Sequence, residues 1–425
     1  MSDLIKRIYK AFDPAPLTTD VDDLYVNLDD VRGSSGLVTE LANNIRLSDT
    51  YTCQLVTGHR GSGKTTELRK LQHQLENSDE KMFVVFCEID EDVDRNDIDY
   101  PDILIAMVRQ MATQLNERLG IKLKPGYFKQ RWDELNKLLK SKIVVKGVDL
   151  QTGLLNFSAA IKSSPDTRTE IRKHLEPHTN NWIAAANDVI GDAILKLSKK
   201  GYDGLVIIVD DLDKMVLRLH TDAGCSTGEH LFVNREGQLS AFKCHLVYTM
   251  PIALAYSCKE RTISNLYGLH HIPIVPMTKI LDIEQKRYES GFESFRHIID
   301  KRLKKADADQ KEIFDDETRD KLIELSGGQP RELMNLIRES IVGGKLPVSN
   351  QTIDQATRKI RHAYARQLQK EHWVIIEQVR KGHYFERTED DDNYWMQLLD
   401  NRAVLQYVND KEWYALNPLL PERKT

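Results

Sequence analysis

The segment that most constrains this chain is a glycine-rich stretch from Gly58 to Thr66, which reads Gly-His-Arg-Gly-Ser-Gly-Lys-Thr-Thr. Its spacing matches the phosphate-loop pattern, in which a glycine precedes four residues of any kind and then Gly-Lys-Ser or Gly-Lys-Thr. Glycines let successive backbone N–H groups turn toward phosphate oxygens, the lysine reaches the terminal phosphates, and the threonine hydroxyl can bind Mg²⁺. The residues predicted to hold the nucleotide are Gly58, Arg60, Gly61, Ser62, Gly63, Lys64, Thr65 and Thr66.

The sequence on either side of the loop supports this interpretation. Residues 51–57 are short and β-rich, as in a buried strand, and residues 67–75 carry leucines with helical spacing. A strand, a glycine loop and a helix in this order aim a helix N-terminus at an anion. Because the pattern arises by chance in on the order of 1% of chains of this length, the prediction also depends on the segments downstream.

Composition restricts the classes of protein to which the chain could belong. The 425 residues are 29% charged and 40% hydrophobic, which is ordinary for globular proteins of two to four domains. The net charge of −5 gives no global basic field for nucleic acid. Five scattered cysteines without a paired spacing fit a reducing cytosol better than disulfides or a zinc site. No apolar run approaches the ~18 residues of a membrane span, so we expect a cytoplasmic protein without membrane contact.

Further strands and helices are expected along the chain. Residues 81–89 form a continuous apolar strand, and residues 101–119 a helix. The acidic loop at 90–95 does not fit a calcium site, because Arg95 stands where such a loop needs glycine. Residues 120–200 are interpreted as an insertion that contains a hairpin within 143–157 and two helices within 166–199.

Two later strands end in polar residues. Residues 204–209 are a buried strand followed by Asp210, expected to hold Mg²⁺ through water, and Asp211, expected to orient or deprotonate an attacking water. Asp213 is expected at the surface. The strand at 244–251 carries Thr249 near its end, which would face the terminal phosphate if this strand lies between the other two. A fifth strand is expected at 271–276.

A helical region follows from 292 to 341 and contains Gly-Gly-Gln-Pro-Arg at 327–331. The glycines end one helix and Pro330 opens the next. Arg331 then lies in the first turn, which is unfavourable for a cation unless it contacts a phosphate. The alternative is a surface arginine.

The order of these motifs resembles an AAA+-type P-loop ATPase over roughly residues 30–365, closest to the origin-recognition-like and STAND/NACHT-like groups. The resemblance implies an α/β parallel-sheet core with a helical lid, and ATP and Mg²⁺ as cofactors. It also implies Lys64 and Thr65 as Walker A, Asp210 and Asp211 as Walker B, Thr249 as sensor 1 and Arg331 as sensor 2. Thr65 and Asp210 would hold the metal. The residues expected to act in catalysis are then Asp211, Lys64, Thr249 and Arg331.

The sequence departs from this family in one carboxylate. AAA+ motors usually carry glutamate where this chain has Asp211, one methylene shorter, so slow and switch-like hydrolysis is expected. Arg261 is the candidate for an arginine finger that reaches a neighbouring subunit.

The last 60 residues resemble a winged-helix domain. Helices are expected at 364–379 and 393–399, followed by a hairpin of residues 404–408 and 413–416. Basic residues within 358–381 favour DNA, whereas the acidic run at 389–392 would repel phosphates from the would-be recognition helix. The balance favours contact with protein, or intramolecular regulation.

The predicted organisation is a P-loop ATPase core at 1–285, with the insertion at 120–200, a helical lid at 286–362 and a winged-helix-like domain at 363–425. The leading hypothesis is a nucleotide-controlled switch that assembles with itself or with a protein partner. The STAND-like resemblance implies a role in bacterial antiviral defence or signalling. A DNA-acting ATPase, such as an origin-type loader or transposition regulator, is the alternative. A non-hydrolysing scaffold is the third hypothesis.

Overall fold

The structure, a computed structural model, describes residues 3–17, 22–33, 36–123, 162, 164–220, 223–343, 345–385, 392–409 and 411–422. The hairpin predicted within 143–157 lies outside these ranges, as do residues 389–391 of the acidic run. Among the described helices, none combines the length and the apolar character that crossing a membrane requires.

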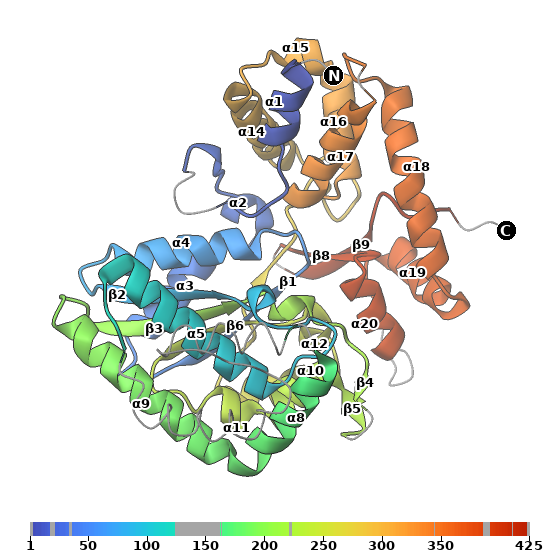
Figure 1. Ribbon diagram of the computed structural model, residues 1–425. Helices are drawn as coiled ribbons and strands as arrows, with labels where there is room; N and C mark the ends of the chain where they lie inside the picture. The colour runs from blue at the N-terminus through green and yellow to red at the C-terminus, as the bar shows by residue number, and fades with distance from the viewer. Residues whose placement is uncertain are drawn as a thin grey trace.

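A five-stranded sheet forms the centre of the molecule (Figure 1), and every pair of neighbouring strands in it is parallel. The strand near Thr249 lies between the strand before the phosphate loop and the strand that ends in Asp210, as its predicted role requires. The α/β parallel-sheet P-loop NTPase core is therefore confirmed. In spatial order the strands are β2 (Met82–Glu88), β3 (Gly204–Asp210), β6 (His245–Thr249), β1 (Cys53–Gly58) and β7 (Ile274–Val275).

Helices cover both faces of the sheet. Alternation along β2 explains how: Val84 and Phe86 belong to one buried apolar cluster, whereas Phe83 and Val85 belong to another. The first cluster packs under α3 (Leu37–Arg46) and α4 (Lys64–Glu76). The second packs under α5 (Tyr100–Leu119) and α9 (Thr179–Ser198), which touch each other on the opposite face (Figure 1).

The region treated as an insertion thus contributes to the core. α9 contacts β3 and α5, and its apolar residues are buried with those of the sheet. The two helices predicted within 166–199 are α9 and α8 (Pro165–Leu175). Short elements complete the core: η2 (Ile89–Glu91), η3 (Glu176–His178), η4 (Leu212–Lys214), β4 (Leu219–His220), β5 (Cys225–Ser226), α10 (Thr227–Glu229), η5 (His230–Asn234), α11 (Glu236–Leu239), α12 (Ile252–Ala255) and α13 (Glu260–Leu266).

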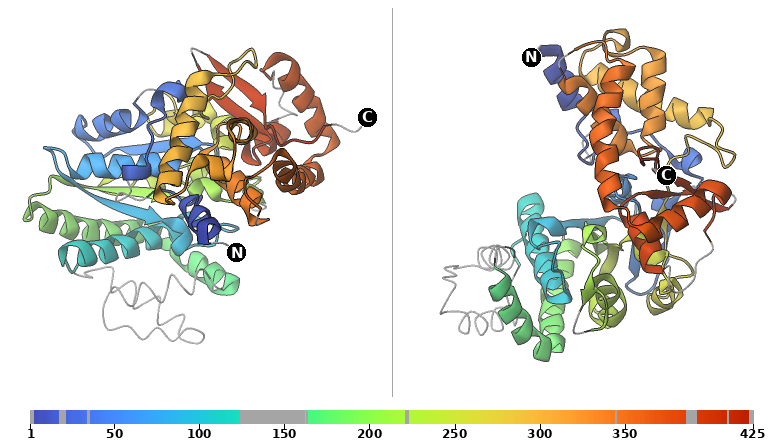
Figure 2. Two further views of the ribbon diagram at one scale, coloured as in Figure 1. Left: turned by 90° about the horizontal axis from the view of Figure 1, so that it is seen from above. Right: turned by 90° about the vertical axis from the view of Figure 1, so that its right-hand side faces the viewer.

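A helical lid stands over the carboxyl end of the sheet (Figures 1 and 2). The N-terminal helix α1 (Asp3–Ala11) packs on the lid, and Ile8 and Phe12 share an apolar core with Phe295 and Leu333. Residues that the sequence analysis grouped with the ATPase core therefore pack with the lid. The lid helices are α14 (Glu289–Lys305), α15 (Gln310–Ile313), α16 (Asp316–Leu325), α17 (Pro330–Val342) and α18 (Asn350–Gln367), approached by η1 (Asp22–Leu24) and α2 (Asp29–Arg32).

The C-terminal unit comprises α19 (Lys370–Gly382), α20 (Asp392–Asp400), β8 (Val404–Val408) and β9 (Glu412–Leu416), with β8 and β9 antiparallel. The predicted hairpin and the helix near 393–399 are confirmed. The continuous helix predicted at 364–379 is wrong. The chain is extended at Leu368 and Gln369, where the backbone N–H of Gln369 donates to His372 Nδ1 (3.0 Å) and starts a new helix.

Candidate nucleotide-binding site

The phosphate loop joins β1 to α4, as the sequence predicts. Gly58, Gly61 and Gly63 all have left-handed φ values, of 148°, 91° and 106°. A Cβ on Gly58 would lie 2.5 Å from the carbonyl oxygen of Val275 in β7, and one on Gly61 would lie 3.2 Å from Cβ of Arg331. Only glycine satisfies both the backbone conformation and the available space, so the loop forms a cradle of backbone N–H groups at the N-terminus of α4.

Lys64 is held at the centre of the site by three protein partners. Its Nζ donates to the carbonyl oxygens of Gly58 (2.6 Å) and His59 (2.9 Å) and lies 2.9 Å from a carboxylate oxygen of Asp213. Both side chains of the Lys64–Asp213 pair are buried. The prediction that Asp213 lies at the surface is wrong, because the short turn η4 folds back over the loop. Burial raises the pKa of Asp213, but Lys64 and other nearby cations outweigh this effect and hold it below its usual value.

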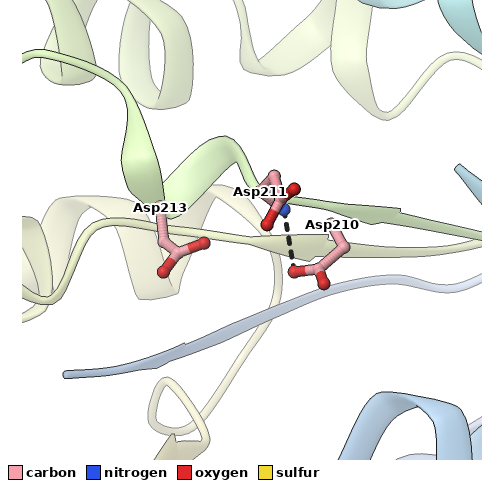
Figure 3. A group of neighbouring side chains, drawn as sticks. All are labelled: Asp210, Asp211 and Asp213. Carbon is pink, nitrogen blue, oxygen red and sulfur yellow. Dashed lines mark hydrogen bonds between the residues drawn. The ribbon is translucent and has the colours of Figure 1, made fainter. Parts of the chain in front are cut away.

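Asp210 carries an unsatisfied oxygen at the end of β3 (Figure 3). Its Oδ1 accepts the backbone N–H of Asp211 (2.7 Å), while its buried Oδ2 has no partner among the described residues. Burial, and then Asp213 and Asp211, raise the pKa of Asp210 to about 6, although the nearby Thr65 hydroxyl acts to lower it. The carboxylates of Asp210, Asp211 and Asp213 offer oxygens within 4.8 Å of one another. A hydroxyl beside a buried, unpaired carboxylate oxygen fits Mg²⁺, which binds through oxygen ligands.

The turn after β3 places Asp211 in a strained conformation. Asp211 has a φ of 72°, which is uncommon for any residue but glycine, and its carboxylate pairs with Lys214. Thr249 braces this turn: its hydroxyl accepts the N–H of Leu212 (3.1 Å) and donates to the carbonyl of Val209 (3.4 Å). Thr249 is fully buried. Its side chain thus acts on the turn that carries Asp211.

Arg331 lies against the phosphate loop, and its expected contact with a phosphate stays a prediction. Pro330 opens α17, and Arg331 in the first turn packs over Gly61. No hydrogen bond or ion pair joins its side chain to another residue of the described ranges. The pocket that it enters encloses about 850 Å³, including the part open to solvent. Of the predicted site residues, this pocket is lined by Arg60, Gly61, Gly63, Lys64, Thr65, Thr66 and Arg331.

Two loop residues contact the C-terminal unit, and the sequence analysis did not predict this contact. The backbone N–H of Gln406 in β8 donates to Nε2 of His59 (2.9 Å), and Arg60 reaches Asp400 at the end of α20 (3.2 Å). Burial, and then Lys64 and Arg402, lower the pKa of His59 to about 3. Its ring is therefore neutral and can accept this hydrogen bond. The signal available in the sequence was a histidine within the loop.

Arg32 also supports the loop, and the sequence analysis missed it. Its guanidinium donates to Glu67 of α4 (2.8 Å) and to the carbonyl of Ser62 (2.5 Å), and both side chains of the Arg32–Glu67 pair are buried. It thereby fixes the segment before α3 against the phosphate loop. Arg261, in contrast, lies exposed on α13 and does not line the pocket, so its role as an arginine finger stays a prediction.

Comparison with known proteins finds similarity among solved structures. No protein-family model matches the chain, and no curated protein matches its sequence. Among solved structures, a Walker-type ATPase of Pyrococcus abyssi aligns over 96% of this chain and 98% of its own, with 12% sequence identity and a TM-score of 0.44. The sheet order and the loop geometry of this chain themselves define the site.

Proposed function

We propose that this chain is a Mg²⁺-dependent, ATP-binding and slowly hydrolysing switch, in which the nucleotide controls how the C-terminal unit docks. The observation that carries the proposal is the direct contact of that unit with the phosphate loop, through Gln406 to His59 and Asp400 to Arg60. Because the C-terminal unit is hydrogen-bonded to the loop, a change in the conformation of the loop alters the contacts of this unit.

The link between nucleotide and docking runs through Lys64. Its ammonium group bonds the carbonyl of His59, whose side chain accepts from Gln406. A phosphate that competes for this ammonium weakens its hold on the His59 backbone. Nucleotide and C-terminal unit therefore act on the same residue, and a ligand that interacts differently with two conformations shifts the balance between them.

The proposed hydrolysis assigns a role to each of the predicted site residues. Thr65 and Asp210 hold Mg²⁺, which when bound neutralises charge on the phosphates. Asp211 orients an attacking water or accepts its proton, and Arg331 contacts the phosphates from the lid. Thr249 fixes the turn that carries Asp211. Asp211→Asn should abolish phosphate release while ATP still binds. If the wild-type protein binds ATP but releases no phosphate, the non-hydrolysing scaffold becomes the better interpretation.

Hydrogen exchange tests the switch. With saturating Mg²⁺ and the analogue AMP-PNP, the amides of β8 and β9 should change their exchange rate, because the docking partner of Gln406 is in the phosphate loop. Lys64→Ala, which removes the ammonium group, is the control and should show no such change. Unchanged exchange in a wild-type protein that demonstrably binds AMP-PNP would contradict the switch.

The proposal also includes a biological role for the switch. The sequence resemblance to STAND-like ATPases supports a role in defence or signalling, within an assembly of this chain with itself or with a protein partner. Size-exclusion chromatography with and without ATP tests this part. An oligomeric state that does not change with nucleotide, whether or not the candidate partner is present, argues against a role in such an assembly.

DNA binding is the second candidate function, and α18 carries the observation in its favour. Arg358, Arg361 and Arg366 are all exposed along this helix. Duplex affinity should then fall steeply with salt, because each neutralised phosphate releases counterions. It should also fall when Arg361 and Arg366 are replaced by alanine. An undetectable interaction at low salt eliminates this candidate.

A further inference from the structure

Part of the lining of the nucleotide pocket is apolar, and phosphate binding does not explain it. Ile298 and Arg302, one turn apart on α14, both line it, and α14 packs there against the residues of η1 and α2. Lys301 fixes this arrangement by donating to the carbonyl of Tyr25 (2.7 Å). Apolar lining comes from Pro14, Ala15, Pro16, Leu17, Leu24, Leu28 and Met334.

Arg302 is a buried cation without a partner. It is 7% exposed, its Nε is unsatisfied, and no ion pair or hydrogen bond joins its side chain to any residue within the described ranges. The carboxylates that line the same pocket are each bonded elsewhere. They form the pairs Asp13–Arg338 (3.6 Å), Glu67–Arg32 (2.8 Å) and Asp213–Lys64 (2.9 Å).

This burial is costly to the folded protein. A charged group removed from water without a compensating hydrogen bond is strongly disfavoured. Accordingly, burial lowers the pKa of Arg302 to about 10, and the guanidinium is still charged at neutral pH. Side chains left in this state inside a pocket are candidates for contact with a ligand, which supplies the missing acceptors.

We propose that Arg302 reads the base of the bound nucleotide, by donating to an acceptor atom of a purine, and so sets base selectivity. This inference deepens the proposed function and rests on nucleotide binding in this pocket. A flat base suits an apolar chamber with a few polar groups, and Lys64 and Arg331, which line the same pocket, are available to the phosphates. A guanidinium only donates, so on adenine it bonds a ring nitrogen and not the amino group, and it distinguishes adenine from guanine where the two bases differ in acceptor atoms.

The test compares Arg302→Met with the wild-type protein and with Lys304→Met, an exposed cation on the same helix. The probes are AMP-PNP, GMP-PNP and inorganic tripolyphosphate. In Arg302→Met we expect the affinity for the better-bound nucleotide to fall about 10-fold to 100-fold, the size of a lost charged hydrogen bond. The ratio of the affinities for the two nucleotides should move toward one, and the affinity for tripolyphosphate should not change. Lys304→Met should bind all three probes with the affinity of the wild-type protein.

Thermal unfolding separates this role from a structural one. Without ligand, Arg302→Met should melt no lower than the wild-type protein, because it removes an unpaired buried charge, but the nucleotide should raise its melting temperature less. A lower ligand-free melting temperature in both Arg302→Met and Arg302→Gln overturns the inference in favour of a structural role.

The binding measurements with Arg302→Met can also contradict the inference. Unchanged nucleotide affinity, equal losses for AMP-PNP and GMP-PNP, or weaker tripolyphosphate binding in Arg302→Met each overturn base reading by Arg302. The proposed function survives these results. It fails separately, and takes the inference with it, if the wild-type protein binds neither nucleotide.

Discussion

Nε2 of His59 in the phosphate loop accepts a 2.9 Å hydrogen bond from the backbone N–H of Gln406, a residue 347 positions later in the chain. The next loop residue, Arg60, reaches the carboxylate of Asp400 and the carbonyl of Met215 (3.3 Å). Three regions thus meet at two consecutive loop residues: the turn after β3, the end of α20 and the strand β8. The loop therefore both lines the pocket and contacts the C-terminal unit.

We predict that acid weakens this contact. The pKa of His59 lies near 3 in the folded protein, under burial and the charges of Lys64 and Arg402, against about 6.5 when unfolded. The unfolded chain therefore binds the extra proton between these values. The stability contributed by neutral His59 is fully present above pH 6.5 and is lost as pH falls toward 3. Between pH 7 and pH 5 the loss is about 2 kcal/mol in the free energy of unfolding.

Other groups also titrate in this range, so the measurement needs a matched variant. In His59→Gln the side-chain oxygen can accept from Gln406 but does not titrate. Chemical denaturation of both proteins at pH 7 and pH 5 should show a larger loss for the wild-type protein by about this amount. Equal losses would mean that His59 is not a buried neutral acceptor.

A second prediction concerns the buried pair of Lys64 and Asp213. Lys64→Ala should prevent nucleotide binding and also lower the free energy of unfolding by about 3–5 kcal/mol, because it leaves the Asp213 carboxylate buried and unpaired. Adding Asp213→Asn should restore much of that stability without restoring binding. Denaturant unfolding of the single and double variants measures the coupling. Strict additivity would show that the pair does not interact as described.

The loop glycines give a third prediction with an internal control. Gly61→Ala forces a side chain into a left-handed position and against Arg331, whereas Gly120→Ala meets the same kind of backbone strain in open space. Both should lose about 1–2 kcal/mol of stability from that strain. Only Gly61→Ala should also weaken nucleotide binding, which calorimetry measures. A matching loss of affinity in Gly120→Ala would show that general destabilisation explains both.

Local pattern was enough to predict most of the sheet and the loop. Continuous apolar runs predicted β2 and β3, and the loop spacing predicted the strand, turn and helix around Lys64. Each of these depends on residues close together in the sequence. The hairpin of β8 and β9 followed from the same kind of signal.

What the sequence could not supply is contact between distant segments. In the sequence Asp213 is one more charged residue of a turn, and it is buried against Lys64, almost 150 positions earlier. Arg32 and Arg302 belong to no motif, and His59 occupies a position of the phosphate loop that the pattern leaves open to any residue. The importance of all three comes from the pocket and the C-terminal unit around them. The division at 364–379 was missed because a helical pattern continues across Leu368 and Gln369, while the local cap interrupts it.

The last prediction concerns Thr249, whose hydroxyl satisfies the buried N–H of Leu212 directly after Asp211. Thr249→Val keeps the shape and removes that acceptor, so the free energy of unfolding should fall by about 1–3 kcal/mol. The turn that carries Asp211 then loses its brace. We expect the rate of phosphate release to fall about tenfold or more, as for a misplaced catalytic group, with little change in nucleotide affinity.

Thr249→Ser is the matched control, because it keeps the hydroxyl and loses only a methyl group. Its rate of phosphate release should stay close to that of the wild-type protein. A fall of equal size in both variants would point to packing around the methyl group, while a loss of nucleotide affinity in Thr249→Val would place the side chain in contact with the ligand. Because Thr249 bonds the backbone on both sides of the Asp210–Asp211 pair, we expect the effect to act on catalysis through the position of Asp211.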